Sequence, residues 1–151
     1  MKIESGKLKT KVLFVCTGNI CRSPMAQVIF GNLCKNKKVT VKGAGTGAGD
    51  GWQMTREALA ALKYCGEKVP RKPLLATRFD KAMIKAYDHI ITMTQAHADF
   101  IGKHPNVKTL DEFTGCGDIM DPYMYPLDVY IDVCKKLQGA LKILYKEIVK
   151  R

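Results

Sequence analysis

The sequence predicts a single-domain α/β protein with a four-stranded parallel sheet, helices on both faces of the sheet and a phosphate-binding loop after the first strand. Three observations predict this fold class. Short apolar runs alternate with amphipathic helical patterns along the chain. The first apolar run ends at a cysteine that opens a loop. The length of 151 residues suits one hydrophobic core rather than two.

The first predicted unit is a strand, a loop and a helix. Residues 11–15 (KVLFV) form an apolar, β-branched and aromatic run typical of a buried strand. A helical pattern follows, in which Ser23 suits the N-cap and Pro24 the first helical position. Apolar residues then recur on one face as far as Leu33. We therefore expect the strand to deliver the loop to the start of a helix.

The middle of the chain predicts a second strand and two helices. The strand covers 39–41, and the glycine-rich segment 43–49 after it is expected to be irregular. A helix is expected from about Thr55 to Tyr64, and a shorter one begins after Asp80.

The last part of the chain predicts two more strands. The strands cover 89–93 and 107–110, and between them Thr94 caps a helix. The final helix carries an apolar stripe from Val133 to Ile148. Because strands and helices alternate, the sheet should be parallel and its ligand should bind at the carboxyl ends of the strands.

One motif, CTGNICRS at residues 16–23, lies at such a strand end. Its cysteine and arginine are separated by five residues, enough to bend the backbone into a cradle of amide N–H groups beside a helix N-terminus. Gly18 permits a tight turn within the cradle. The strand before the motif and the Ser-Pro helix start after it supply the context that this spacing needs. The motif therefore predicts a phosphate-binding loop.

The residue types in this loop suit phosphoryl transfer. Cys16 would be the nucleophile, because the helix N-terminus and Arg22 favour its thiolate. The Arg22 guanidinium can hold two phosphoryl oxygens while the loop amides stabilise the transition state. We expect Ser23 to donate a hydrogen bond to the thiolate and Asn19 to brace the loop. The predicted phosphate-binding and loop-supporting residues are Thr17, Gly18, Asn19, Ile20, Cys21 and Ser23.

Departure of an alcohol or phenol also requires a proton, so a carboxylic acid should face the cradle. The candidate is Asp121, which Pro122 biases toward an extended conformation and Tyr123 follows as an aromatic wall. Asp-Pro-Tyr also occurs in solvated turns without function, and the residues alone leave both readings open.

Composition excludes several other classes. The net charge of +11 comes from twenty lysines and five arginines spread along the chain, and it favours anionic substrates. No zinc-finger spacing, RNA-binding aromatic motif or basic helix predicts nucleic-acid binding. No apolar run is long enough for a membrane span, and residues 1–10 are polar with no signal-type stretch. We expect a cytoplasmic protein.

The six cysteines are expected to be reduced thiols. Cys34, Cys65 and Cys134 fall in or at the end of helical patterns, where a free cysteine packs as a small apolar residue. No CxxC pair or cysteine–histidine spacing indicates a metal, and no cofactor is predicted.

The segments VCTGNICRSPMA and MDPY resemble the low-molecular-weight protein tyrosine phosphatase family, over nearly the whole chain from Val12 to the final helix. The resemblance implies that Cys16 is the nucleophile, that Arg22 binds phosphate and that Asp121 is the acid and then the base, without a metal. The implied substrate is a phosphotyrosine protein or peptide, with phosphate, sulfate or vanadate as inhibitory anions. We expect a polar extension, 1–10, and a phosphatase domain, 11–151.

The resemblance also implies a substrate groove and a redox pair. Trp52 and Tyr123 match aromatic residues of the groove, and Cys21 matches a cysteine that forms a reversible disulfide with Cys16. Ile20 should face the leaving group, where its apolar side chain favours a flat phenol over a guanidinium. Phosphotyrosine is therefore the expected substrate.

The chain departs from the family pattern at three places. Many members have a serine and a histidine that help tether the loop asparagine, where this chain has Gly43 and Arg71. Met124 follows the Asp-Pro-Tyr segment in place of a frequent glycine. The support of Asn19 and the shape of the groove mouth therefore stay open.

Three alternatives compete with this reading. A protein-arginine phosphatase belongs to the same family. An arsenate reductase of this fold needs two further cysteines as a disulfide relay, and Cys65, Cys116 and Cys134 are expected to lack a close pair. A non-catalytic phosphoprotein-binding module would not need the nucleophile Cys16.

Overall fold

The computed structural model describes residues 9–149 as one α/β domain with a four-stranded, all-parallel sheet of order β2-β1-β3-β4. The predicted fold class is confirmed. The predicted extension, 1–10, lies outside the described residues except for its last two, and Thr10 is the first residue of β1. The elements in chain order are β1 (Thr10–Cys16), α2 (Arg22–Leu33), β2 (Val39–Gly45), α3 (Arg56–Tyr64), α4 (Ala82–Ala86), β3 (His89–Thr92), α5 (Gln95–Ile101), β4 (Val107–Thr109), α6 (Leu110–Thr114) and α7 (Leu127–Ile148).

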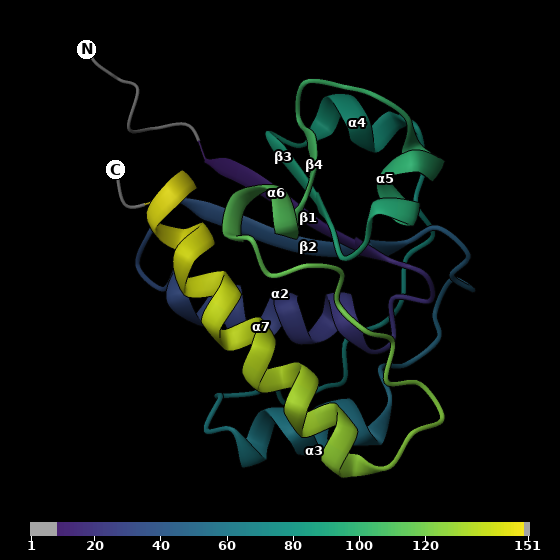
Figure 1. Ribbon diagram of the computed structural model, residues 1–151, viewed down its shortest axis with the longest axis vertical. Coiled ribbons are helices and arrows are strands. Elements are labelled where there is room, and N and C mark those ends of the chain that lie inside the picture. The colour runs from purple at the N-terminus through teal and green to yellow at the C-terminus, as the bar shows by residue number, and fades with distance from the viewer. Residues whose placement is uncertain (1–8, 150–151) are drawn as a thin grey trace.

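Helices cover both faces of the sheet (Figure 1). The helices α2, α3, α6 and α7 pack on one face, where Val12 and Phe14 of β1 point into the larger core. Leu13 and Val15 point the opposite way, toward the residues of α4 and α5. The alternation follows from the two-residue period of a strand. It makes β1 the buried centre of the domain, so the loop after it starts from a rigid base.

The second strand is longer than the sequence pattern predicts. Segment 43–49 was expected to be irregular, but β2 continues to Gly45, which pairs with Cys16 in the parallel ladder. A Cβ atom at Gly45 would overlap the carbonyl oxygen of Thr17. The glycine is needed because the loop after β1 lies directly against this strand. The expectation of an irregular segment was wrong for 43–45.

Two helix starts also differ from prediction. α2 begins at Arg22 with Cys21 as its N-cap, and no side chain caps its first N–H groups. Ser23 therefore lies inside the helix and not at its cap, since its hydroxyl serves the loop instead. Leu110 belongs to α6 rather than to the fourth strand. Thr109 and Glu112 start this unpredicted helix with a reciprocal capping box.

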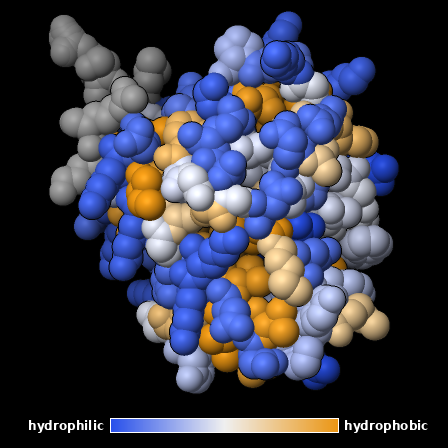
Figure 2. Space-filling model, in the orientation of Figure 1, coloured by the Kyte–Doolittle hydropathy of each residue, from blue (hydrophilic) through white to orange (hydrophobic). Residues whose placement is uncertain are grey.

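The surface agrees with the composition. Figure 2 shows hydrophilic side chains over most of one face, with hydrophobic ones gathered toward the end where α3 and the start of α7 lie. Within residues 9–149, no helix is both long and apolar enough to cross a bilayer.

Candidate active site

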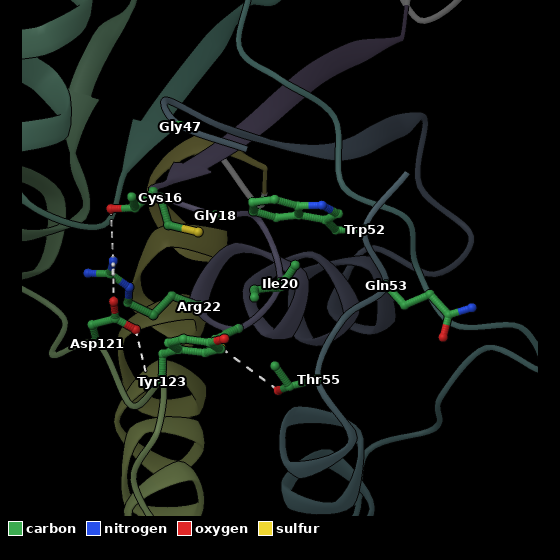
Figure 3. Close-up of a pocket in the computed structure, with 12 residues that line it drawn as sticks. Cys16, Gly18, Ile20, Arg22, Gly47, Trp52, Gln53, Thr55, Asp121 and Tyr123 are labelled. Carbon is green, nitrogen blue, oxygen red and sulfur yellow. Dashed lines mark hydrogen bonds and ion pairs between the residues drawn. The ribbon is translucent and has the colours of Figure 1, made fainter. Parts of the chain in front are cut away.

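A cavity of about 620 Å³ opens at the carboxyl end of β1, where the loop after Cys16 meets the N-terminus of α2 (Figure 3). The predicted loop, the predicted acid and both predicted groove aromatics meet here, although Cys16 and Tyr123 are more than 100 residues apart in the sequence. Its lining residues are Cys16, Thr17, Gly18, Ile20, Cys21, Arg22, Gly47, Trp52, Gln53, Thr55, Asp121 and Tyr123. Among them, Gly47, Gln53 and Thr55 carried no functional signal in the sequence.

The sulfur of Cys16 lies at the floor of the cavity within a set of hydrogen-bond donors. The Asn19 backbone N–H donates to Cys16 Sγ at 3.3 Å, and Ser23 Oγ lies 3.0 Å from the same sulfur. The Asn19 side-chain amide donates to Ser23 Oγ at 2.5 Å. Because that bond occupies a lone pair of Ser23, the hydroxyl hydrogen of Ser23 is free to donate to a Cys16 thiolate. This geometry stabilises negative charge on the sulfur.

The space beside Gly43 explains how Asn19 is held. Asn19 adopts a left-handed backbone conformation, with φ of 55°, and is buried. Its Oδ1 accepts the Thr77 backbone N–H at 3.0 Å. A Cβ atom at Gly43 would lie 2.7 Å from Asn19 Nδ2, so the asparagine amide fills the space that a side chain at position 43 would need. Arg71 is exposed, and the contacts of Asn19 come from Thr77 and Ser23.

Arg22 is buried with its guanidinium fixed at three points. Its Nη1 donates to the Ile119 carbonyl oxygen at 3.1 Å and its Nη2 to Thr17 Oγ1 at 3.3 Å. The same Nη2 lies 3.5 Å from Asp121 Oδ2. Because three oxygen atoms from different segments hold it, the guanidinium has a fixed orientation.

The predicted acid lies on an exposed loop that is tied to the sheet. The side chain of Asp121 is 51% exposed, and its Oδ1 accepts the Tyr123 backbone N–H at 3.1 Å. Two residues earlier, the Ile119 N–H donates to the Met93 carbonyl oxygen at 2.9 Å. Asp121 therefore lies beside the Arg22 guanidinium at the edge of the cavity that holds Cys16 (Figure 3), and about half of its side chain stays open to solvent.

Three apolar side chains form the walls above the sulfur. Figure 3 shows Ile20 between the rings of Trp52 and Tyr123, which lie on opposite sides of the opening. Trp52 is 53% and Tyr123 51% exposed, so both rings form a rim rather than part of the core. A flat ring fits between such walls better than a hydrated polar group.

Cys21 points away from solvent and is bonded to a buried tyrosine. Its Sγ lies 3.3 Å from Tyr130 Oη and 3.8 Å from Thr55 Oγ1. Burial raises the pKa of the Cys21 thiol, an effect that its bonds to Tyr130 and Thr55 partly offset. Cys21 is therefore a neutral thiol in the wall of the cavity.

Two other cysteines are closer together than expected. Cys65 ends α3, Cys134 lies on α7, and their thiols share a hydrogen bond. The pKa of Cys134 is raised mainly by burial and further by this neighbour. The expectation that these cysteines lack a close pair was wrong. The pair packs between two helices and does not line the cavity.

A parallel α/β sheet that brings a thiol, a buried guanidinium and a helix N-terminus to one cavity defines the class of phosphate-binding enzymes with a cysteine in the loop. No cluster of three or more metal-ligating side chains occurs in the part of the chain that the structure describes. The sequence profile described as "Low molecular weight phosphotyrosine protein phosphatase" matches residues 11–151. The chain belongs to this family of protein phosphatases.

Relatives with different substrate names are about equally similar to the chain. A protein-arginine-phosphatase of Geobacillus stearothermophilus is 37% identical over 91% of this chain and 95% of its own length. The low molecular weight protein-tyrosine-phosphatase PtpB of Staphylococcus epidermidis is 36% identical over 90% and 98%. The solved low molecular weight protein tyrosine phosphatase of T. tengcongensis is 34% identical, with a TM-score of 0.83 over 93% of this chain and 100% of its own.

Proposed function

We propose that the protein hydrolyses phosphotyrosine in proteins or peptides through a phosphocysteine intermediate on Cys16. The observation that carries this proposal is the position of Cys16 Sγ at the floor of a cavity with apolar walls from Ile20, Trp52 and Tyr123. The walls suit a phenol ring, and the depth suits a side chain long enough to bring its phosphorus down to the sulfur. The shorter phosphoserine fits this arrangement poorly.

In the first step, the Cys16 thiolate attacks phosphorus and the bond from phosphorus to the tyrosine oxygen breaks. Arg22 binds two of the phosphoryl oxygens, and the loop N–H groups from Thr17 to Arg22 stabilise the charge that develops on the phosphoryl group. Asp121 donates its proton to the departing phenolate oxygen. The products of this step are the free tyrosine and phosphocysteine.

In the second step, water attacks phosphorus and the sulfur leaves. The Asp121 carboxylate, which lost its proton in the first step, takes a proton from the water. Ser23 donates to the thiolate as it leaves, and the 3.0 Å contact of its Oγ with Cys16 Sγ supports this role. Phosphate is released and the enzyme returns to its starting state, without a metal or cofactor in either step.

A protein-arginine phosphatase is the second candidate, and the similarity to a named arginine phosphatase supports it. The argument for phosphotyrosine rests on Ile20, because a guanidinium placed against this side chain would lose water without gaining an acceptor. An arsenate reductase is disfavoured because the Cys65–Cys134 pair lies outside the cavity lining.

Further features of the proposal concern ligands and redox state. Phosphate, sulfate and vanadate should bind the loop as inhibitory anions, since all three match its donors. Peroxide would convert the Cys16 thiolate to a sulfenic acid, and attack by Cys21 would release water and form a reversible disulfide. The six free cysteines suit a reducing compartment such as the cytoplasm. We retain the division into an extension, 1–10, and a domain, 11–151.

The experiment that tests the mechanism is rapid quenching of the enzyme with a phosphotyrosine peptide, followed by mass spectrometry of the active-site peptide. A phosphate adduct on Cys16 should appear within the first turnover. Cys16→Ser should abolish turnover while still binding vanadate, because the loop amides and Arg22 remain. Substantial hydrolysis by Cys16→Ser would rule out the covalent route.

A further inference from the structure

A buried imidazole lies directly behind the phosphate loop, outside the cavity. His97 is in the first turn of α5, is 6% exposed and does not line the cavity. Its Nε2 lies 2.9 Å from Thr17 Oγ1, and its Nδ1 lies 2.9 Å from Thr94 Oγ1. Both ring nitrogens are therefore bonded, one to the loop and the other to the N-cap of its own helix.

Thr17 connects this imidazole to the phosphate-binding guanidinium. Arg22 Nη2 donates to Thr17 Oγ1 at 3.3 Å, and an arginine can only donate. The Thr17 hydroxyl keeps its own hydrogen, which it can donate to His97 Nε2. His97 Nδ1–H then donates to Thr94 Oγ1, which also accepts the His97 backbone N–H at 3.3 Å. When His97 is neutral and protonated on Nδ1, Arg22 Nη2, the Thr17 hydroxyl and His97 Nδ1–H each donate to the next member of this series of hydrogen bonds, and the series ends on Thr94 Oγ1.

At its Thr94 end, this series of hydrogen bonds lies next to a contact with the loop that carries Asp121. Thr94 is the N-cap of α5. The next backbone N–H, that of Gln95, donates to Asp118 Oδ1 at 3.0 Å, three residues before Asp121. His97 therefore lies between the phosphate loop and the acid loop. Thr17 cannot turn without breaking its bond to His97, and Arg22 cannot turn without breaking its bond to Thr17.

We propose that His97 is a positioning residue of the phosphate site, which acts as a neutral acceptor from Thr17 and thereby holds the Arg22 guanidinium in its binding orientation. The proposal rests on the proposed function only in assigning phosphate binding to Arg22. The charged groups that face the imidazole are Arg22 from α2 and Asp118 and Asp121 from the acid loop. Burial, and then the positive charge of Arg22, lower the pKa of His97 to about 4, while the two aspartates oppose the shift. A doubly protonated ring would donate from Nε2 and could no longer accept a hydrogen bond from the Thr17 hydroxyl.

The test pairs variants that keep or remove the acceptor. In His97→Gln the amide oxygen takes the place of Nε2, whereas His97→Leu keeps the bulk without an acceptor. By titration calorimetry with inorganic phosphate, His97→Leu should bind about three- to tenfold more weakly than the wild type, and His97→Gln within about twofold of it. Thr17→Val removes the same bond from the other side together with the acceptor of Arg22 Nη2, so the double variant Thr17→Val/His97→Leu should lose little more than Thr17→Val alone.

Nuclear magnetic resonance measures the tautomer of His97, which would not be fixed if the ring only filled space. A long-range ¹H–¹⁵N spectrum at neutral pH should show His97 protonated on Nδ1 and unprotonated on Nε2. The opposite tautomer, a doubly protonated ring or phosphate affinity equal in His97→Leu and the wild type would overturn the proposal. Neither measurement uses a phosphorylated peptide, so failure on phosphotyrosine would sink the proposed function alone.

Discussion

The floor of the cavity is buried and hydrogen-bonded, whereas its rim is exposed to solvent. On the floor, Asn19, Arg22 and Ser23 are buried and their polar groups are bonded to one another or to backbone groups of neighbouring elements. On the rim, the rings of Trp52 and Tyr123 are about half exposed. Binding of a phosphoryl group requires hydrogen-bond donors in fixed positions, which the buried floor provides. Selection among leaving groups depends on the exposed rim side chains, because a substrate packs against them.

The largest expected effect on kcat comes from a substitution of Asp121. This side chain is exposed like the rim, but it contacts Arg22 of the floor. Asp121→Ala should lower kcat on a phosphotyrosine peptide by about 10²- to 10⁴-fold, because the phenolate then leaves without a proton. Nitrophenyl phosphate should be affected far less, since its leaving group is a weak base. Parallel kinetics on the two substrates check this. Equal losses would show that another group is the acid.

A smaller loss of kcat/KM, equal for all substrates, should follow when a methyl group is introduced next to Asn19 of the floor. In Gly43→Ala the new Cβ would lie 2.7 Å from Asn19 Nδ2 and 3.0 Å from Gln27 Oε1. Displacing Asn19 weakens its bond to Ser23 and should lower kcat/KM by about tenfold on every substrate.

Gly139→Ala is the matched control for that variant. Nothing lies within 4 Å of a Cβ at this helical position, and alanine is favoured over glycine in a helix by about 1 kcal/mol. The control should keep full activity and unfold at a slightly higher denaturant concentration. Full activity in Gly43→Ala as well would show that the packing around Asn19 does not support the loop.

The buried floor should also make stability depend on pH. The pKa of His97 falls from 6.5 to about 4 on folding, so the unfolded chain binds more protons between these values and the free energy of unfolding rises with pH. The contribution of His97 to the free energy of unfolding is fully present above pH 6.5 and is lost as the pH falls toward 4. It is at most about 3 kcal/mol. Denaturant titrations of wild type and His97→Gln should show the steeper pH dependence in the wild type. Parallel curves would contradict a neutral, buried His97.

The floor could be predicted largely from the sequence because its residues are close along the chain. Residues 16–23 carry the proposed nucleophile Cys16, the guanidinium of Arg22 and the bracing residue Asn19 within one loop between a strand and a helix. The parts that could not be predicted depend on contacts distant in sequence. The bond from Thr77 to Asn19 and the pairing of Cys65 with Cys134 have no local pattern.

Other features have a local sequence pattern that is compatible with more than one structure. The segment Thr109-Leu-Asp-Glu112 is a capping-box sequence, yet an apolar run across it favoured a strand. The glycines of 43–45 suggest a loop, and only the closeness of Thr17 and Asn19 shows why a strand needs them. His97 stands three residues after the helix cap Thr94, a spacing that places both on the turn facing the phosphate loop.

The central claim, that the rim selects phosphotyrosine, is tested most directly by kcat/KM on matched peptides carrying phosphotyrosine or phosphoarginine. The wild type should prefer phosphotyrosine, and Ile20→Thr should reduce the preference by about 10- to 200-fold. Ile143→Thr, a change of the same type on the exposed side of α7, should leave the ratio unaltered. A wild type that prefers phosphoarginine, or a ratio that Ile20→Thr does not change, would contradict the account.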